Sequence, residues 1–139
     1  MTENQESAKQ LQQRYMEFQL VGAQIKRVRE QLQQLDQQLV DLDGVKDNLE
    51  ELKTTVGGTD LFVPVSSGIF MRAKAGAMDK VVLNVGAGVA VAKSIPDAQQ
   101  LISEQMEQAG KLREQMMTSL NALLDAGKQL QAELEKLVA

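Results

Sequence analysis

The sequence contains one glycine-rich stretch of the kind that can bind phosphates, Gly86-Ala87-Gly88. A dinucleotide-binding loop needs a third glycine and a following helix whose N-terminus holds the pyrophosphate. Here the third glycine is missing, and the residues that follow predict a strand. We therefore interpret this stretch as the tight turn of a β-hairpin and expect no cofactor.

Two acidic pairs, Glu50-Glu51 and Asp41-Asp43, carry oxygen ligands that could bind a cation. They lie beside an apolar seam on a predicted helix, which favours a solvent-exposed outer face over a metal site. The sequence has no histidine and no cysteine, so it lacks the usual general base near neutral pH and the commonest metal ligands. We predict no catalytic residues, no metal site and a protein that is not an enzyme.

Composition narrows the range of partners. Only 3% of residues are aromatic, which favours helices over a compact globule. The 15 Lys and Arg residues stand against 19 Asp and Glu, and the net charge of −4 gives no electrostatic reason to bind nucleic acid. No apolar run approaches the ~20 residues that span a bilayer. We expect a soluble, cytoplasmic protein that binds neither nucleic acid nor membranes.

Apolar residues recur every seven positions in the first part of the chain, in two rows three residues apart, as in a coiled-coil seam. The rows are Leu11, Phe18, Ile25, Leu32 and Leu39, and Val21, Val28, Leu35, Leu42 and Leu49. They predict a helix over about 6–56 that Gly57-Gly58 closes.

A second seam of the same period predicts a helix over 95–138. Its rows are Ile102, Ala109, Met116, Leu123, Leu130 and Leu137, with Met106, Leu120 and Leu134. Ser94 is a suitable N-cap with Asp97 three residues later, and Pro96 falls in the first turn. Neither helix can bury its apolar stripe alone, so we expect the two to pair as an antiparallel coiled coil.

Between the helices the apolar period changes to two, which predicts two β-hairpins over 59–94. The fold class is therefore α+β, an antiparallel two-helix coiled coil joined by two β-hairpins. Four short strands are marginal alone and expose unpaired edges, so we expect oligomerisation through this segment. The residues expected at the oligomer contacts are Leu61, Val63, Val65, Ile69, Val81, Leu83, Val85, Val89 and Val91.

Antiparallel pairing would place the two chain ends side by side. Pairing Val56 with about Pro96 puts Phe18 near Leu134 and leaves residues before Phe18 close to, or beyond, the last partner residues. Apolar side chains exposed there would mark an interaction site, whereas the alternative is that they complete the seam and fray. The candidate binding residues are Leu11, Tyr15, Phe18, Leu130, Leu134 and Leu137, with Met16 and Val138 beside them.

The central segment carries a family resemblance. Leu61–Phe70 reads LFVPVSSGIF and Asp79–Val89 reads DKVVLNVGAGV. These runs are similar to the "V-P-hydrophobic-S-x-G" and "D-K-V-x-x-x-V-G-x-G" stretches of prefoldin subunits. With its order of helix, two hairpins and helix, the chain resembles the α class of archaeal-type prefoldin, since β-class subunits carry one hairpin. We accordingly expect residues 1–139 to form a single prefoldin α-type unit.

The resemblance implies a hexamer of two α and four β subunits, in which the hairpins form a β-barrel platform that carries the coiled coils. It implies an ATP-independent holdase chaperone that binds unfolded polypeptides at the coiled-coil tips and delivers them to a group II chaperonin. Two alternatives stay open at this point. One is a self-assembling filament scaffold of the same family, and the other is a coiled-coil adaptor for one folded partner.

Overall fold

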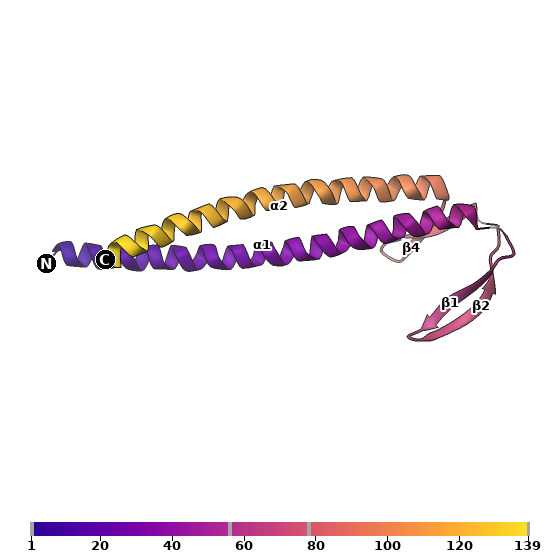
Figure 1. Ribbon diagram of the computed structural model, residues 1–139, viewed down its shortest axis with the longest axis horizontal. Helices are drawn as coiled ribbons and strands as arrows, with labels where there is room; N and C mark the ends of the chain where they lie inside the picture. Colours follow the sequence, from indigo (N-terminus) through magenta and orange to yellow (C-terminus); the bar gives the residue numbers. More distant parts are fainter. Residues whose placement is uncertain (1, 56, 78, 139) are drawn as a thin grey trace. The chain divides into compact units, whose positions relative to one another are not determined.

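The computed structural model describes residues 2–55, 57–77 and 79–138. Along the chain, one long helix precedes four short strands and a second long helix follows them (Figure 1). The elements are α1 (Thr2–Thr54), β1 (Asp60–Ser66), β2 (Ile69–Lys74), β3 (Lys80–Gly86), β4 (Val89–Ser94) and α2 (Ile95–Val138). The predicted fold class, two long helices joined by two hairpins, is confirmed.

The helix boundaries differ slightly from the predicted ones. Helix α1 begins at Thr2 rather than near Glu6, and Glu3 in its first turn complements the positive end of the helix dipole. Its predicted end at Val56 lies outside the described residues. Over the residues described, neither helix contains a stretch that is long and apolar enough to cross a membrane.

The chain divides into two parts. The first, which we call the helical unit, comprises α1 up to Gln38 and α2 from Ala109 onward. The second, which we call the hairpin unit, comprises Leu39–Gln108 and contains all four strands.

In the helical unit α1 and α2 run antiparallel (Figure 1). Arg113 Nε lies 2.6 Å from Asp36 Oδ1 and links the two helices. The seam residues pack between them, and the buried ones are Leu32, Leu35, Ala109 and Leu120. This confirms the predicted antiparallel seam.

The hairpin unit has its own apolar cluster. Leu49 of α1 packs with Ala98 and Ile102 of α2, and all three are buried. The partly buried residues packed against this cluster are Leu42, Leu52, Met106, Val81 and Leu83. The predicted cap at the start of α2 is confirmed, because the Asp97 backbone N–H donates to Ser94 Oγ over 3.2 Å.

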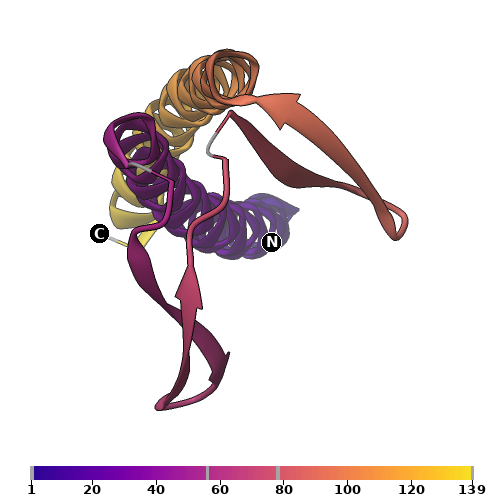
Figure 2. The ribbon, with the colours of Figure 1, turned by 90° about the vertical axis from the view of Figure 1, so that its right-hand side faces the viewer.

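The strands form two separate antiparallel ribbons, β1 with β2 and β3 with β4 (Figure 2). We call them the first and second hairpins. The second hairpin turns through Gly86, Ala87 and Gly88, whose φ angles of 99°, 52° and 73° are all positive. Positive φ at both central residues is the geometry of a tight hairpin turn, which confirms the turn prediction for this glycine-rich stretch. Among the described strands no sheet closes into a barrel.

Candidate binding surfaces

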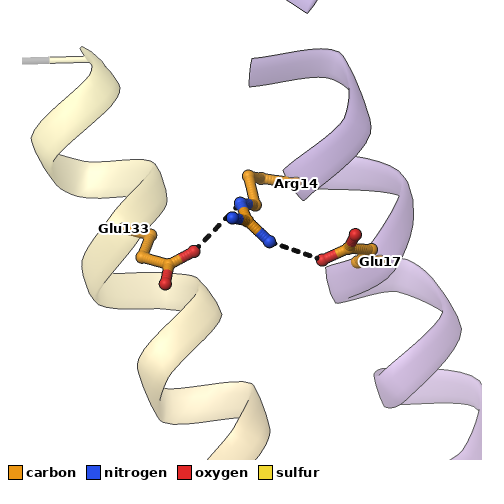
Figure 3. A network of polar contacts seen from close by, with 3 residues as sticks. All are labelled: Arg14, Glu17 and Glu133. Atoms are coloured by element: carbon orange, nitrogen blue, oxygen red, sulfur yellow. Dashed lines mark hydrogen bonds and ion pairs between the residues drawn. The ribbon is translucent and has the colours of Figure 1, made fainter. Parts of the chain in front are cut away.

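An ion pair joins the two helices near their free ends and shows their register. Arg14 Nε of α1 lies 3.1 Å from Glu133 Oε2 of α2, and Arg14 Nη1 lies 3.1 Å from Glu17 Oε2 on its own helix (Figure 3). With Arg14 beside Glu133 and equal rise along both helices, Val138 lies near the level of Lys9. The first turns of α1 therefore extend past the last described residue of α2 (Figure 1).

An apolar groove lies between the helices on one side of this ion pair, and we call it the end groove. Its lining side chains are Tyr15, Phe18, Gln131, Leu134, Glu135 and Val138, and its volume is about 510 Å³. Tyr15 is 53% exposed and Val138 is 74% exposed, whereas Phe18 and Leu134 are half-buried. The predicted proximity of Phe18 and Leu134 is thus present, and Tyr15 lines the same groove, close to the last described residues of α2.

The structure separates the remaining predicted binding residues. Leu137 is exposed but lines a different hollow, together with Arg14, Glu133 and Lys136 of the ion-pair region. Leu11 and Leu130 are half-buried. The six candidates therefore do not form one continuous patch, and Tyr15, Phe18 and Leu134 are the ones that share a groove.

The first hairpin is apolar on both faces. Its register pairs Val63 with Met71, and alternation along the strands puts Leu61 and Ile69 on that same face. The opposite face carries Phe62 and Phe70, and Val65 falls where the register shifts. The two phenylalanines are 69% and 61% exposed and line one hollow.

The second hairpin is partly packed against the chain's own helices and partly exposed. Val81 and Leu83 pack against the chain's own cluster around Leu49. Val91, which pairs with Leu83, is exposed, as are Val85 and Val89 nearer the turn. The nine residues predicted at oligomer contacts thus include two that already have an intramolecular packing role.

Sequence reasoning missed several exposed apolar residues on the hairpins. They are Phe62, Phe70, Met71 and Val82. The signal was present, because in the first hairpin both alternating rows are largely apolar, Leu61-Val63-Val65 and Phe62-Pro64. A strand with apolar residues in both rows indicates a ribbon whose two faces are both covered.

Among the acidic residues considered as cation ligands, Glu50 makes polar contacts on the helix surface. Glu50 Oε2 accepts a hydrogen bond from Gln99 Nε2 over 2.8 Å and lies 3.6 Å from Lys53 Nζ. Across the described residues there is no group of three or more His, Cys, Asp or Glu side chains placed to hold a metal ion.

Comparison with known proteins matches this architecture to one family. A family model described as "Prefoldin subunit" matches residues 21–139. The prefoldin subunit alpha of Methanosarcina barkeri is 30% identical over 137 residues, covering 96% of this chain and 93% of the relative. That of Methanococcus aeolicus is 27% identical over 129 residues, covering 93% of this chain and 88% of the relative.

Among solved structures, a chain of filamentous prefoldin from Methanocaldococcus jannaschii superposes with a TM-score of 0.74 at 27% identity. The superposition covers 83% of this chain and 95% of that one. Family model, relatives and fold therefore agree over most of the sequence. The chain belongs to the prefoldin family of chaperone subunits, and within it to the α class.

Proposed function

We propose that the chain is the α subunit of an ATP-independent holdase, which binds unfolded polypeptides at its free helix ends and passes them to a group II chaperonin. In this proposal residues 1–139 act as one α-type unit, without enzymatic activity, in the cytoplasm. The family is one of non-enzymatic chaperones whose subunits assemble into oligomers with other prefoldin subunits. The α₂β₄ composition, the nature of the clients and the transfer to a chaperonin are the finer parts of the proposal.

The end groove is the observation that supports client binding at the free helix ends. Leu32 and Leu35 are buried in the seam, whereas Tyr15 and Val138, which lie outside the seam rows near the free helix ends, are more than half exposed. The groove offers aromatic and aliphatic side chains together with Gln131 and Glu135. Such a surface accepts apolar side chains without demanding one sequence, which suits unfolded clients.

The hairpins support the proposed assembly with other prefoldin subunits. A two-stranded ribbon is marginally stable in water by itself. The first hairpin exposes Phe62 and Phe70 on one face and Val63, Ile69 and Met71 on the other. Pairing with hairpins of β subunits into a barrel platform would enclose one of these faces inside the barrel. Several arms on one platform would then hold a client by avidity, although each groove binds weakly.

The decisive experiment combines assembly with activity. The chain is mixed with a prefoldin β subunit, the complex is isolated by size-exclusion chromatography with light scattering, and suppression of aggregation of a denatured, unrelated protein is measured without nucleotide. We expect a hexamer that suppresses aggregation. The double variant Tyr15→Ser/Val138→Ser should keep the hexamer and lose most of the suppression.

The matched control is Val40→Ser, because Val40 is 65% exposed on the same helix but belongs to the hairpin unit. This control should retain full suppression. A hexamer that protects clients equally well with and without Tyr15 and Val138 would refute client binding in the end groove. A mixture that never yields a joint complex would refute the subunit assignment.

A filament scaffold is the second candidate. It is favoured by the superposition on filamentous prefoldin from Methanocaldococcus jannaschii, at a TM-score of 0.74. In that case the exposed hairpin faces pair chain to chain without β subunits. Light scattering of the chain alone distinguishes the two, because a filament gives very large species whose mass rises with concentration, whereas an α subunit stays a small oligomer.

A further inference from the structure

The seam between the two helices lacks an apolar side chain at Gly127. This residue lies seven positions after Leu120 and seven before Leu134, in the same seam row of α2. A Cβ built on Gly127 would lie 3.7 Å from Val21 Cγ1 and 3.9 Å from Ile25 Cδ1, so the position faces α1. A seam position normally inserts a side chain between residues of the facing helix, and here that side chain is missing.

A second glycine, Gly22, lies at the same level in the opposite helix. It directly follows Val21, one of the two residues that Gly127 faces. A Cβ added at Gly22 meets nothing within 4 Å, so close packing does not require a glycine there. Glycine in a helix interior shifts the local equilibrium away from helix about fivefold relative to alanine. Both helices are therefore weakened at one level.

The packing of the seam differs on the two sides of this level. We call residues 23–38 and 109–126 the stem, and residues 2–21 and 128–138 the tip. The stem contains buried seam residues, among them Leu32 and Leu120. In the tip, by contrast, no described residue is buried. Regions with few buried apolar contacts open locally at low cost, so the tip is the less stable part.

Each part has one ion pair between the helices. Arg113 Nε lies 2.6 Å from Asp36 Oδ1 in the stem, and Arg14 Nε lies 3.1 Å from Glu133 Oε2 in the tip. The side chains of Arg14 and Glu133 are 45% and 49% exposed, and ion pairs so exposed contribute little to stability. The contact that joins the tip segments is therefore one that breaks and forms again easily.

We propose that Gly22 and Gly127 form a joint at which the tip opens, so that its two helical segments move apart and close again while the stem stays paired. The joint is a property of this chain and needs no ligand. Its use rests on the proposed function, because opening would adjust the width of the end groove. The paired glycines thereby confine the movement to one level of the helices.

Amide hydrogen exchange of the full chain, assembled with β subunits, tests the joint. Tip amides should exchange faster than stem amides. Gly22→Ala/Gly127→Ala, which we call the joint variant, should slow exchange of the tip by up to about 25-fold, given about fivefold for each glycine. The matched control is Gly44→Ala/Gly110→Ala, two helix-interior glycines at which an added Cβ also meets nothing within 4 Å. This control should leave tip exchange unchanged.

Electron paramagnetic resonance between two spin labels makes the opening visible. The sequence has no cysteine, so labels attach only at introduced positions, and excess unlabelled chain limits each assembly to one labelled copy. Gln13→Cys/Lys136→Cys reports on the tip, where both positions line one hollow. Gln31→Cys/Leu112→Cys reports on the stem, where both line another. We expect an additional, longer distance for the tip pair alone, and the joint variant should remove most of it.

The outcomes separate the joint from the proposed function. A tip distance as narrow as that of the stem would overturn the joint, and so would tip exchange slowed equally by the joint variant and its control. If the joint is overturned while Tyr15→Ser/Val138→Ser loses suppression of aggregation, client binding in the end groove stands. If the joint is present but Tyr15→Ser/Val138→Ser protects clients normally, that client binding fails.

The use of the joint has its own test in the aggregation assay. The joint variant should suppress aggregation less well than Gly44→Ala/Gly110→Ala, although both variants gain helix stability. Equal suppression by the two variants would overturn the role of the joint in adjusting the end groove.

Discussion

Replacing Gly127 of α2 by alanine should stabilise the protein by about 1 to 1.5 kcal/mol. Glycine in a helix interior is less favourable than alanine by about 1 kcal/mol. An added Cβ would lie 3.7 Å from Val21 Cγ1 and 3.9 Å from Ile25 Cδ1, which are ordinary van der Waals contacts. The new methyl group is therefore partly buried against α1 without strain, which adds up to about 0.5 kcal/mol.

Gly22 provides the matched comparison. It lies in the interior of α1, and a Cβ added there meets nothing within 4 Å. Gly22→Ala should therefore gain the helix-propensity contribution alone, about 1 kcal/mol. The difference between the two variants measures how closely the helices approach each other at Gly127.

Thermal unfolding followed by circular dichroism at 222 nm tests this at a fixed protein concentration, because the melting temperature of an assembling protein depends on concentration. At this chain length, 1 kcal/mol corresponds to a rise in Tm of roughly 4 °C. Both variants should melt higher than the parent, Gly127→Ala by the larger margin. A lower Tm for Gly127→Ala alongside a higher Tm for Gly22→Ala would refute the reasoning, since it would mean that the helices approach too closely at Gly127 to admit a methyl group.

Three further substitutions test local features by the same thermal unfolding. Ser94→Ala should lower the free energy of unfolding by about 1 kcal/mol, because the Asp97 N–H loses its hydrogen-bond acceptor. Ser94→Thr should retain most of that stability. Ala87→Gly should raise the free energy of unfolding by about 0.5 to 1 kcal/mol, because Ala87 has a φ of 52°, a left-handed conformation that is unfavourable for alanine. An unchanged or lower Tm would contradict a left-handed turn there. Leu49→Ala should cost about 2 to 4 kcal/mol, because Leu49 is 5% exposed within its cluster. Val40→Ala, its exposed control, should change stability by less than about 0.5 kcal/mol.

Periodicity predicted the elements of this fold because each has a strong local cause. The heptad rows place Leu32 and Leu35 in the seam, and both are buried. The Ser94 cap and the Gly86-Ala87-Gly88 turn depend on backbone requirements that a few neighbouring residues satisfy. Such features need no knowledge of distant parts of the chain.

The binding surfaces were harder to predict because they depend on register. A heptad pattern says which side of a helix faces its partner, but the axial position depends on long-range contacts such as Arg14 with Glu133. In the resulting register Tyr15 shares a groove with Leu134, while Leu137 lines the hollow on the ion-pair side. In the same way, the sequence assigned Val81 and Leu83 to oligomer contacts, but only the tertiary structure shows that they pack against a cluster of the chain's own helices.

The apolar surfaces of the chain differ in extent, and this difference determines which partner each suits. The first hairpin is one layer thick and apolar on both faces, with Val63 and Met71 on one and Phe62 and Phe70 on the other. Water contacts both faces unless partners cover them, and permanent interfaces are the large, apolar ones. The end groove exposes a few apolar side chains among polar ones, which suits weak binding that is released without a chemical step. We therefore expect lasting assembly through the hairpins and reversible client contact at the helix ends, where weak binding becomes useful only because several arms share one assembly.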